Sequence, residues 1–450
     1  MFTKTSIRSP WPVLLLLAAV AGCSDDGAGP STSTADFTVT VANVSDARDC
    51  LTSGAFDTPV GADTPGPIGP GQAYEFRVGA APGDRLSFAT MFVHSNDLFY
   101  APGGGGIALY GAKSAPLDGD VTDQVRLWDA GTEANQEPGL GMDQAPRQSG
   151  ANAGAADPDD TVRMVDDGYA YPAVSDVIQV VVTPEGGGEF TVRIENVSDS
   201  ATLSPSSGPS LAVPLAPGVY AVHAGTAPLF TEDMTDRGEG LEHVAEDGNP
   251  AGLAAALAPR TGVVTPLAPG AYAVHAAGRF MYADGQPNGG HGLEALAEDA
   301  DPGALVGYLQ TLDDVSSAGV FTVPDGAAAA GPIFPGDACT FAFTAGEGDR
   351  LSFGSMFGQS NDLFYGFGDG SLALFDAQGD PVEGNVTAMV NLWDAGTEMN
   401  QWPGAGPDQA PRQAAANSGT ADPDTDVRMV DDGYVYPAAA GVIRVTIAAE

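Results

Sequence analysis

The sequence is poor in basic residues and in cysteine. Its 450 residues include 17 Lys and Arg against 59 Asp and Glu, which gives a formal net charge of −42. A surface this acidic repels phosphate backbones and anionic lipid head groups, so nucleic acid and an acidic membrane surface are poor partners. Cations are the natural partners of such a surface. Three Cys residues are too few for a disulfide-framework protein.

A long hydrophobic run is also missing. The apolar stretch near the N-terminus follows Lys4 and Arg8 and is shorter than the ~20 residues that a membrane-spanning helix needs. This pattern predicts a signal peptide over residues 1–23. It ends in Val-Ala-Gly-Cys, which resembles the lipobox of bacterial lipoproteins and implies a lipid on Cys23. The alternative is an ordinary secretory signal with an incidental Cys. Residues 24–35 are rich in Gly, Ser and Thr, which indicates a flexible tether.

Internal repetition, in contrast, is abundant. The segment LSFATMFVHSNDLFY from Leu86 recurs as LSFGSMFGQSNDLFY from Leu351, with 11 of 15 residues identical. WDAGTEANQEPGLGMDQAPRQ from Trp128 recurs from Trp393 with 17 of 21 residues identical. Both pairs, and a third block that begins VRMVDDGY, share an offset of 265 residues. Two modules therefore share one backbone across these blocks without insertions.

A second offset sets the module boundaries. FTVTVANVSD at Phe37 matches FTVRIENVSD at Phe190 at an offset of 153, so the second module carries 112 extra residues. This insert, at about 200–313, consists of two units, because PLAPGVYAVHA recurs as PLAPGAYAVHA 52 residues later. Each unit pairs a short strand with a helical segment. We therefore predict module 1 at 36–185 and module 2, with the duplicated strand-helix insert, at 186–450.

The remaining secondary structure is predicted to be strands. Phe37, Val39 and Val41 alternate with Thr and Ala, and other β-branched or aromatic runs are bounded by Pro and Gly turns. Strands of this length and spacing predict an all-β chain with one antiparallel β-sandwich in each module. The Gly- and Pro-rich segments between the strands are predicted to be loops.

Acidic residues that recur in both modules are the candidates for a functional site. Asp-x-x-x-Glu in WDAGTE places two carboxylates on one Gly-containing turn, and another Asp follows directly on a predicted strand. Ca²⁺ takes about 6 to 8 oxygen ligands at ~2.3–2.6 Å, so these acids suit it better than Zn²⁺. The alternative is that the acids cap turns on an acidic surface. The candidate metal ligands are Asp97, Asp129 and Glu133 in module 1 and Asp362, Asp394 and Glu398 in module 2.

The same segments carry a family resemblance. LSF-x-T-M-x-x-x-S-x-D, which ends in Asp97, and W-D-A-G-T-[DE] at Trp128 resemble the spondin domain of the extracellular-matrix protein F-spondin, in two copies over most of 36–450. The resemblance implies a β-sandwich similar to C2 domains, with one Ca²⁺ per module. In each module the three acids named above would hold the ion. The last of the three acids is Asp in the animal proteins and Glu here, at Glu133 and Glu398. The thrombospondin repeats of animal spondins are absent, so matrix or heparin binding is not transferred.

Other chemistries have weaker support. Paired carboxylates could serve a secreted glycan hydrolase, but His94 near the motif is not repeated and is no shared base. His223 and His275 are repeat-equivalent and could bind Zn²⁺ or Cu²⁺, although no Cys/His spacing supports this. A Ser-centred elbow, a P-loop and a dinucleotide fingerprint are absent from the sequence. Cys50 and Cys339 occupy non-equivalent positions, and either a disulfide between modules or two free thiols fits.

These features together predict a protein that is not an enzyme. We expect a lipid-anchored, Ca²⁺-binding protein of the cell envelope outside the cytoplasm, in the outer membrane or at the cell surface, with secretion as the alternative. It would act in adhesion or in binding an unknown protein or glycan, and would contact the membrane through its lipid only. A secreted glycan hydrolase and a metal-free structural envelope protein are the alternative functions.

Overall fold

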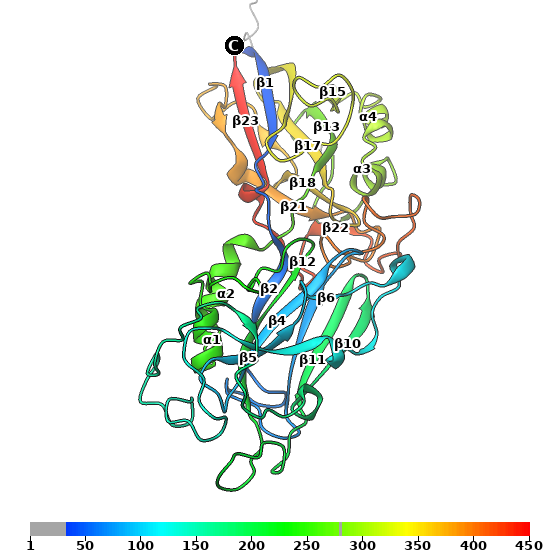
Figure 1. Cartoon of the computed structure of the whole chain (residues 1–450). Helices are drawn as coiled ribbons and strands as arrows, with labels where there is room; N and C mark the ends of the chain where they lie inside the picture. The colour runs from blue at the N-terminus through cyan, green and yellow to red at the C-terminus, as the bar shows by residue number, and fades with distance from the viewer. Residues whose placement is uncertain (1–32, 279–280) are drawn as a thin grey trace, which may run out of the picture.

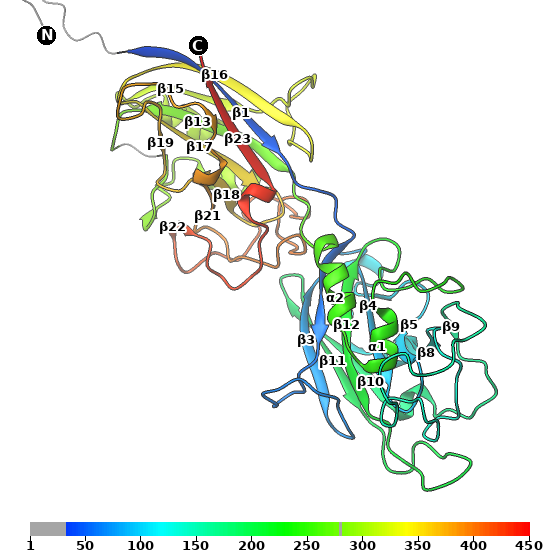
Figure 2. The ribbon, with the colours of Figure 1, turned by 90° about the vertical axis from the view of Figure 1, so that its left-hand side faces the viewer.

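The computed structural model describes residues 33–278 and 281–450. The chain forms two lobes, each built from two antiparallel sheets (Figure 1 and Figure 2). The predicted all-β class with antiparallel β-sandwiches is confirmed. The predicted signal peptide, its Cys23 and nearly all of the predicted tether lie outside the described residues. None of the helices in the described ranges is long and apolar enough to cross a membrane.

The lower lobe in Figure 1 is continuous in sequence, and we call residues 50–262 the inserted lobe. Its elements are β2 (Cys50–Phe56), β3 (Ala73–Gly79), β4 (Arg85–Phe92), β5 (Leu98–Pro102), β6 (Ile107–Ala108), β7 (Gly119–Asp120), β8 (Val125–Asp129), β9 (Arg163–Met164), β10 (Ile178–Gly186), β11 (Glu189–Asn196), β12 (Leu215–His223), α1 (Leu241–Asp247) and α2 (Ala251–Leu257). One sheet has the strand order β3-β11-β10-β7. The other has the order β2-β12-β4-β5-β8-β9, with β6 beside β4.

The upper lobe is assembled from two separate stretches of chain, and we call residues 34–43 together with 263–450 the split lobe. Its elements are β1 (Thr34–Asn43), β13 (Leu267–His275), β14 (Gln286–Pro287), α3 (Leu293–Asp299), α4 (Gly303–Leu309), β15 (Val315–Phe321), β16 (Ala338–Gly346), β17 (Arg350–Phe357), β18 (Leu363–Phe367), β19 (Leu372–Ala373), β20 (Gly384–Asn385), β21 (Val390–Asp394), β22 (Asp426–Met429) and β23 (Ile443–Ala449). The sheets have the orders β16-β1-β23-β20 and β14-β22-β21-β18-β17-β13-β15. Apart from β14, these orders match those of the inserted lobe position by position.

The strand pairing divides the chain differently from the predicted modules 36–185 and 186–450. Strand β1, predicted to open module 1, lies between β16 and β23 of the split lobe, where Phe37 faces Phe343 and Ala449. Its repeat equivalent β11, predicted to open module 2, pairs with β3 and β10 in the inserted lobe. Sequence repeats identify equivalent strands, but they do not say which sheet a strand joins, because pairing is set in three dimensions.

A shared asparagine network shows where one lobe interrupts the other. In the inserted lobe, Asn196 Nδ2 donates to the carbonyl oxygens of Ile68 and Val213. In the split lobe, Asn43 Nδ2 donates to the carbonyl oxygens of Thr265 and Ile333, at 2.8 and 2.9 Å. Residues 197–214 therefore connect β11 to β12 in the inserted lobe. At the equivalent place in the split lobe, between β1 and β13, the chain contains the whole inserted lobe.

The predicted insert at about 200–313 is also divided between the lobes. Its first strand-helix unit supplies β12, which pairs with β2 and β4, and its second supplies β13, which pairs with β15 and β17. Each lobe thus contains one unit. The two helices of each unit pack on the larger sheet, on the side opposite the other sheet, around Trp128 in one lobe and Trp393 in the other.

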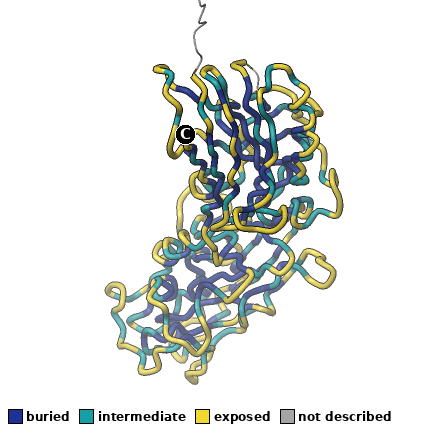
Figure 3. Tube along the Cα trace, turned by 90° about the horizontal axis from the view of Figure 1, so that it is seen from above, coloured by how far each residue is buried: buried dark blue, intermediate teal, exposed yellow. Residues whose placement is uncertain are grey.

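The main core of each lobe lies between its two sheets, and Figure 3 shows the buried strands surrounded by exposed loops. The alternation predicted for β1 is realised, since Phe37, Val39 and Val41 are at most 1% exposed. Cys50 and Cys339 lie on strands of different lobes and are both buried and free. The disulfide considered from the sequence is therefore not formed.

Candidate metal centre in each lobe

Two of the three predicted ligands meet at one edge of the larger sheet. Asp97 directly precedes β5 and Asp129 ends β8, and these strands are neighbours because Leu98 pairs with Asp129. Ala130 N–H donates to the Asp97 carbonyl oxygen at 3.2 Å, which fixes the two backbones side by side. Asp97 is fully buried and Asp129 is 1% exposed. Asp362 and Asp394 repeat this arrangement in the split lobe, where Leu363 pairs with Asp394.

Asp97 binds the WDAGT turn with only one of its carboxylate oxygens. Its Oδ2 accepts from Thr132 N at 2.8 Å, Thr132 Oγ1 at 3.0 Å and Glu133 N at 3.0 Å. Its Oδ1 is buried and has no hydrogen-bond partner among the described residues. Asp362 Oδ1 is in the same state. An unpartnered buried carboxylate oxygen carries a desolvation cost, so its recurrence in both lobes requires an explanation.

Asp129 is already provided with a positive charge. Its Oδ1 accepts from Gly131 N at 2.7 Å, and its Oδ2 accepts from Asn135 Nδ2 at 2.7 Å and from Arg163 Nη2 at 2.8 Å. The same Arg163 nitrogen reaches Asp157 Oδ2 at 2.8 Å. In the split lobe, Arg428 bridges Asp394 and Asp422 in the same way.

The third predicted ligand is engaged elsewhere. Glu133 Oε1 accepts from Gly154 N at 2.6 Å and Oε2 accepts from Asn96 Nδ2 at 3.1 Å. Glu398 repeats this with Gly419 and Asn361. Among the described residues, no group of three or more His, Cys, Asp or Glu side chains is arranged to hold a metal ion. The structure therefore brings Asp97 and Asp129 together but directs Glu133 to the loop that contains Gly154.

A fourth buried acid reaches the cluster from a helix. Glu246 on α1 is 1% exposed, and its Oε1 lies 2.7 Å from Thr132 Oγ1, which is also 3.0 Å from Asp97 Oδ2, so the two acids share one hydroxyl. Its Oε2 is buried without a partner among the described residues. Glu298 on α3 is equivalent and also 1% exposed. Sequence reasoning missed both, although their recurrence in LEHVAED and LEALAED was a usable signal.

Burial changes the protonation of the cluster. Desolvation raises the pKa of Asp97, and it raises that of Asp129 to about 7 with a further contribution from the Asp97 charge. Desolvation also raises the pKa of Glu246 to about 8 and that of Glu298 to about 7. Near neutral pH, protons on these buried carboxyl groups therefore add to the positive charge of Arg163 and Arg428, and a cation would displace the protons.

The donor set matches the predicted cation in part. All the candidate groups are oxygen donors, as a hard cation requires, and the unpartnered Asp97 Oδ1 and Asp362 Oδ1 are free to coordinate. Asp129 and Glu133, whose oxygens all accept hydrogen bonds, would each have to exchange one for coordination. The two histidines considered for Zn²⁺ lie in different lobes and each bonds a different serine, so they form no joint site.

A scan against protein-family models found no match, and a search of curated proteins also found none.

Proposed function

We propose that the protein is a lipid-anchored, Ca²⁺-binding protein of the cell envelope that acts in adhesion or ligand binding, with the metal in a structural role. The observation that carries the cation site is the buried, unpartnered Oδ1 of Asp97 and of Asp362, each beside a second buried carboxylate. The same oxygen is left free in two lobes that differ in chain order.

The proposed ligands are Asp97, Asp129 and Glu133 in the inserted lobe and Asp362, Asp394 and Glu398 in the split lobe. A bound Ca²⁺ would be coordinated by the unpartnered Oδ1 of Asp97 or Asp362 and would balance the charge of that carboxylate. Asp97 already anchors the WDAGT turn through its other oxygen, and Glu133 anchors the loop at Gly154. These residues would therefore transmit cation binding to the order of both loops. Binding to the folded state alone stabilises it by about 2.7 kcal/mol at 100 times Kd.

Burial of the acids argues for a structural role over hydrolysis. Asp97, Asp129 and Glu133 are each at most 3% exposed. A glycosidase needs its acid and base on either side of a bound sugar, and a glycan cannot reach these carboxylates while the WDAGT turn is in place. The hydrolase alternative therefore has no support from the geometry of this cluster.

Thermal unfolding with Ca²⁺ and with EDTA tests the cation site. We expect Ca²⁺ to raise the Tm of the mature chain and EDTA to reverse the change. The double variant Asp97→Asn with Asp362→Asn keeps an acceptor for the turn amides but removes the charge, so its Ca²⁺ response should be lost. Asp63→Asn, at an exposed loop position, is the matched control. An equal Ca²⁺ response in wild type and double variant would contradict the proposal.

The lipid anchor is tested separately. If Cys23 carries a lipid, the wild-type protein should fractionate with membranes and the Cys23→Ser variant should not. A Cys23→Ser variant that still fractionates with membranes would leave the cation site untouched but would contradict the anchor.

A further inference from the structure

A serine and a histidine face each other on neighbouring strands of the inserted lobe. Ser87 lies on β4 and His223 ends β12, and Ser87 Oγ is 2.9 Å from His223 Nε2. His223 Nδ1 is 3.1 Å from the carbonyl oxygen of Gly225. A carbonyl oxygen only accepts, so Nδ1 carries a proton and donates it. Burial lowers the pKa of His223, which keeps the ring neutral, and Nε2 is then the acceptor for the Ser87 hydroxyl proton.

The equivalent pair in the split lobe has a different hydrogen-bond pattern. Ser352 Oγ lies 2.8 Å from His275 Nε2, but it also donates to the Gly370 carbonyl oxygen at 2.5 Å. The single hydroxyl proton of Ser352 is therefore drawn to a backbone acceptor. Among the described residues, the Ser87 side chain bonds only His223.

One residue difference explains this change of partner. In the split lobe, Arg350 Nε donates to Ser371 Oγ at 2.7 Å, which leaves the Gly370 carbonyl oxygen to Ser352. In the inserted lobe the position of Ser371 is Gly106. Arg85 Nε instead donates to the Gly105 carbonyl oxygen at 3.0 Å, and Arg85 Nη2 donates to that of Gly106 at 2.7 Å. Because Arg85 occupies the Gly105 carbonyl oxygen, which is equivalent to that of Gly370, Ser87 has His223 as its acceptor.

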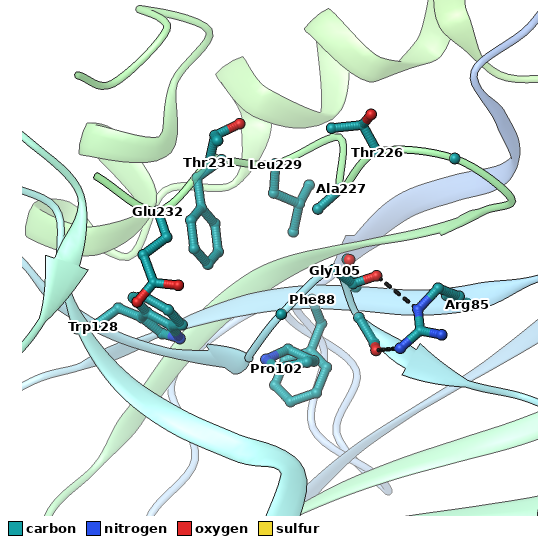
Figure 4. A pocket seen from close by; sticks show the side chains of 15 residues that line it. Arg85, Phe88, Pro102, Gly105, Trp128, Thr226, Ala227, Leu229, Thr231 and Glu232 are labelled. Atoms are coloured by element: carbon teal, nitrogen blue, oxygen red, sulfur yellow. Dashed lines mark hydrogen bonds between the residues drawn. The ribbon is translucent and has the colours of Figure 1, made fainter. Parts of the chain in front are cut away.

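Ser87 also lines a pocket, shown in Figure 4. The cavity has a volume of about 570 Å³, within the range of small-ligand sites. Figure 4 shows Arg85 and Gly105 beneath the segment that carries Thr226 and Leu229, with Glu232 near Trp128. Ser87 is 5% exposed, whereas Ser352 is fully buried. The polarised serine is thus the one that a small molecule can approach.

We propose that Ser87 and His223 form a catalytic dyad that hydrolyses a small carboxylic ester bound in this pocket. Ser87 Oγ attacks the ester carbonyl carbon while its proton passes to His223 Nε2, and Gly225 holds the ring by accepting from Nδ1–H. The carbon–alkoxide bond then breaks, and the alcohol leaves with the proton from Nε2. Water attacks the acyl-serine, its proton passes to Nε2, and release of the carboxylic acid returns the proton to Ser87 Oγ.

The pocket lining indicates the kind of ester. Phe88, Leu229 and Trp128 provide apolar walls that suit a short aliphatic or aromatic acyl group. Gly104 and Gly105 line the same cavity with left-handed backbone, at φ of 57° and 97°. Main-chain N–H groups of such a loop are the donors that stabilise an oxyanion. The dyad is separate from the cation cluster and would operate whether or not Ca²⁺ binds.

Covalent labelling tests the dyad directly. The full mature chain is treated with a fluorophosphonate, which modifies activated serines, and the modified peptide is identified by mass spectrometry. We expect labelling at Ser87, none at Ser352, and p-nitrophenyl butyrate hydrolysis that is lost in Ser87→Ala and kept in Ser352→Ala. His223→Gln should slow labelling about 100-fold, the lower end of the contribution of a general base.

The internal control makes a negative result informative. Ser352→Ala changes an equivalent serine and should leave both labelling and ester hydrolysis unchanged. Wild-type protein that melts cooperatively yet is not labelled at Ser87 would overturn the proposal. So would ester hydrolysis that persists in Ser87→Ala, or equal labelling of Ser87 and Ser352.

Discussion

The inserted lobe and the split lobe build the same pair of sheets from chain that is connected in different orders. In the inserted lobe, residues 197–214 join β11 directly to β12. In the split lobe, the equivalent strand β1 is separated from β13 by the entire inserted lobe. Strand positions are therefore fixed by side-chain pattern and pairing, while the length of one connection is nearly unconstrained. This agrees with the slow growth of loop-closure entropy with loop length.

The point of insertion explains why both lobes tolerate it. The ends of the inserted lobe are held together, since Asp49 N–H donates to the Arg260 carbonyl oxygen and Gly262 N–H to that of Cys50, both at 3.0 Å. A domain whose ends are adjacent can interrupt a surface loop of another without stretching it. The inserted lobe thus occupies the position of an ordinary loop.

The strongest test of this comparison is to express the inserted lobe and the repeat-based module as separate proteins. We expect residues 46–262 to fold and to melt cooperatively, because they contain both complete sheets of the inserted lobe. Residues 36–185, the module expected from the repeats, lack β11 and β12 and should remain unfolded. Circular dichroism and thermal melts distinguish the two. A cooperative melt for 36–185 and none for 46–262 would refute the lobe assignment.

Matched core substitutions test the same assignment in the full chain. Phe37 and Phe190 are repeat-equivalent and at most 1% exposed. Truncation of a buried Phe to Ala costs about 3–5 kcal/mol. Phe37→Ala should lower the unfolding transition of the split lobe and Phe190→Ala that of the inserted lobe, as resolved by hydrogen exchange in each sheet. Loss of protection in the opposite lobe would show that β1 and β11 are placed wrongly.

Each lobe should respond to pH through its own buried glutamate. Burial raises the pKa of Glu246 to about 8 and that of Glu298 to about 7. A carboxyl group whose pKa is raised by folding holds its proton more tightly in the folded state. Its contribution to stability is fully present below about pH 4 and is lost as pH rises through the folded-state pKa. One pKa unit corresponds to about 1.4 kcal/mol.

In EDTA, we therefore expect both lobes to lose stability between about pH 5 and 8. Glu246→Gln should flatten the profile of the inserted lobe only, and Glu298→Gln that of the split lobe only. Thermal melts across this range measure both. Stability that rises with pH in this window would mean that the cluster is ionised in the folded state.

The smallest expected effect concerns the contact between the lobes. The backbone N–H of Trp402 donates to the Gly187 carbonyl oxygen at 3.2 Å, and a Cβ on Gly79 would lie 2.0 Å from the indole, so the Trp402 side chain lies directly on the inserted lobe. Its equivalent Glu137 instead bonds Ser206 within the inserted lobe. Trp402 is only partly buried, so Trp402→Ala should cost about 1–2 kcal/mol.

We expect Trp402→Ala to separate the two unfolding transitions in calorimetry, and Glu137→Ala to leave their spacing unchanged. Equal effects of the two substitutions would indicate that this contact does not couple the lobes.

The sequence was sufficient for the fold class and for part of the site. The alternation of Phe37, Val39 and Val41 predicted a buried strand, and the repeats located both Asp97 and Asp129. What it could not supply was the pairing of distant segments. β1 joins strands more than 290 residues away, as the pairing of Val41 with Cys339 illustrates, and nothing local in the strand specifies that choice.

The same reason explains the missed site residues. Ser87 and His223 are 136 residues apart, and Thr132 and Glu246 are 114 apart. Neither pair forms a local motif, so only the folded sheets and helices bring them into contact. The hydrogen bonds of Glu133 were hidden from the sequence for a related reason, because the asparagine and the glycine amide that bind its carboxylate lie on two separate loops.

Calorimetric Ca²⁺ titration of the mature chain tests the proposed cation sites most directly. We predict two sites per chain, one in each lobe, with one site lost in Asp97→Asn, the other lost in Asp362→Asn, and none left in the double variant. Absence of binding heat in wild-type protein, or two sites that persist in the double variant, would contradict the assignment of Asp97 and Asp362 as cation ligands.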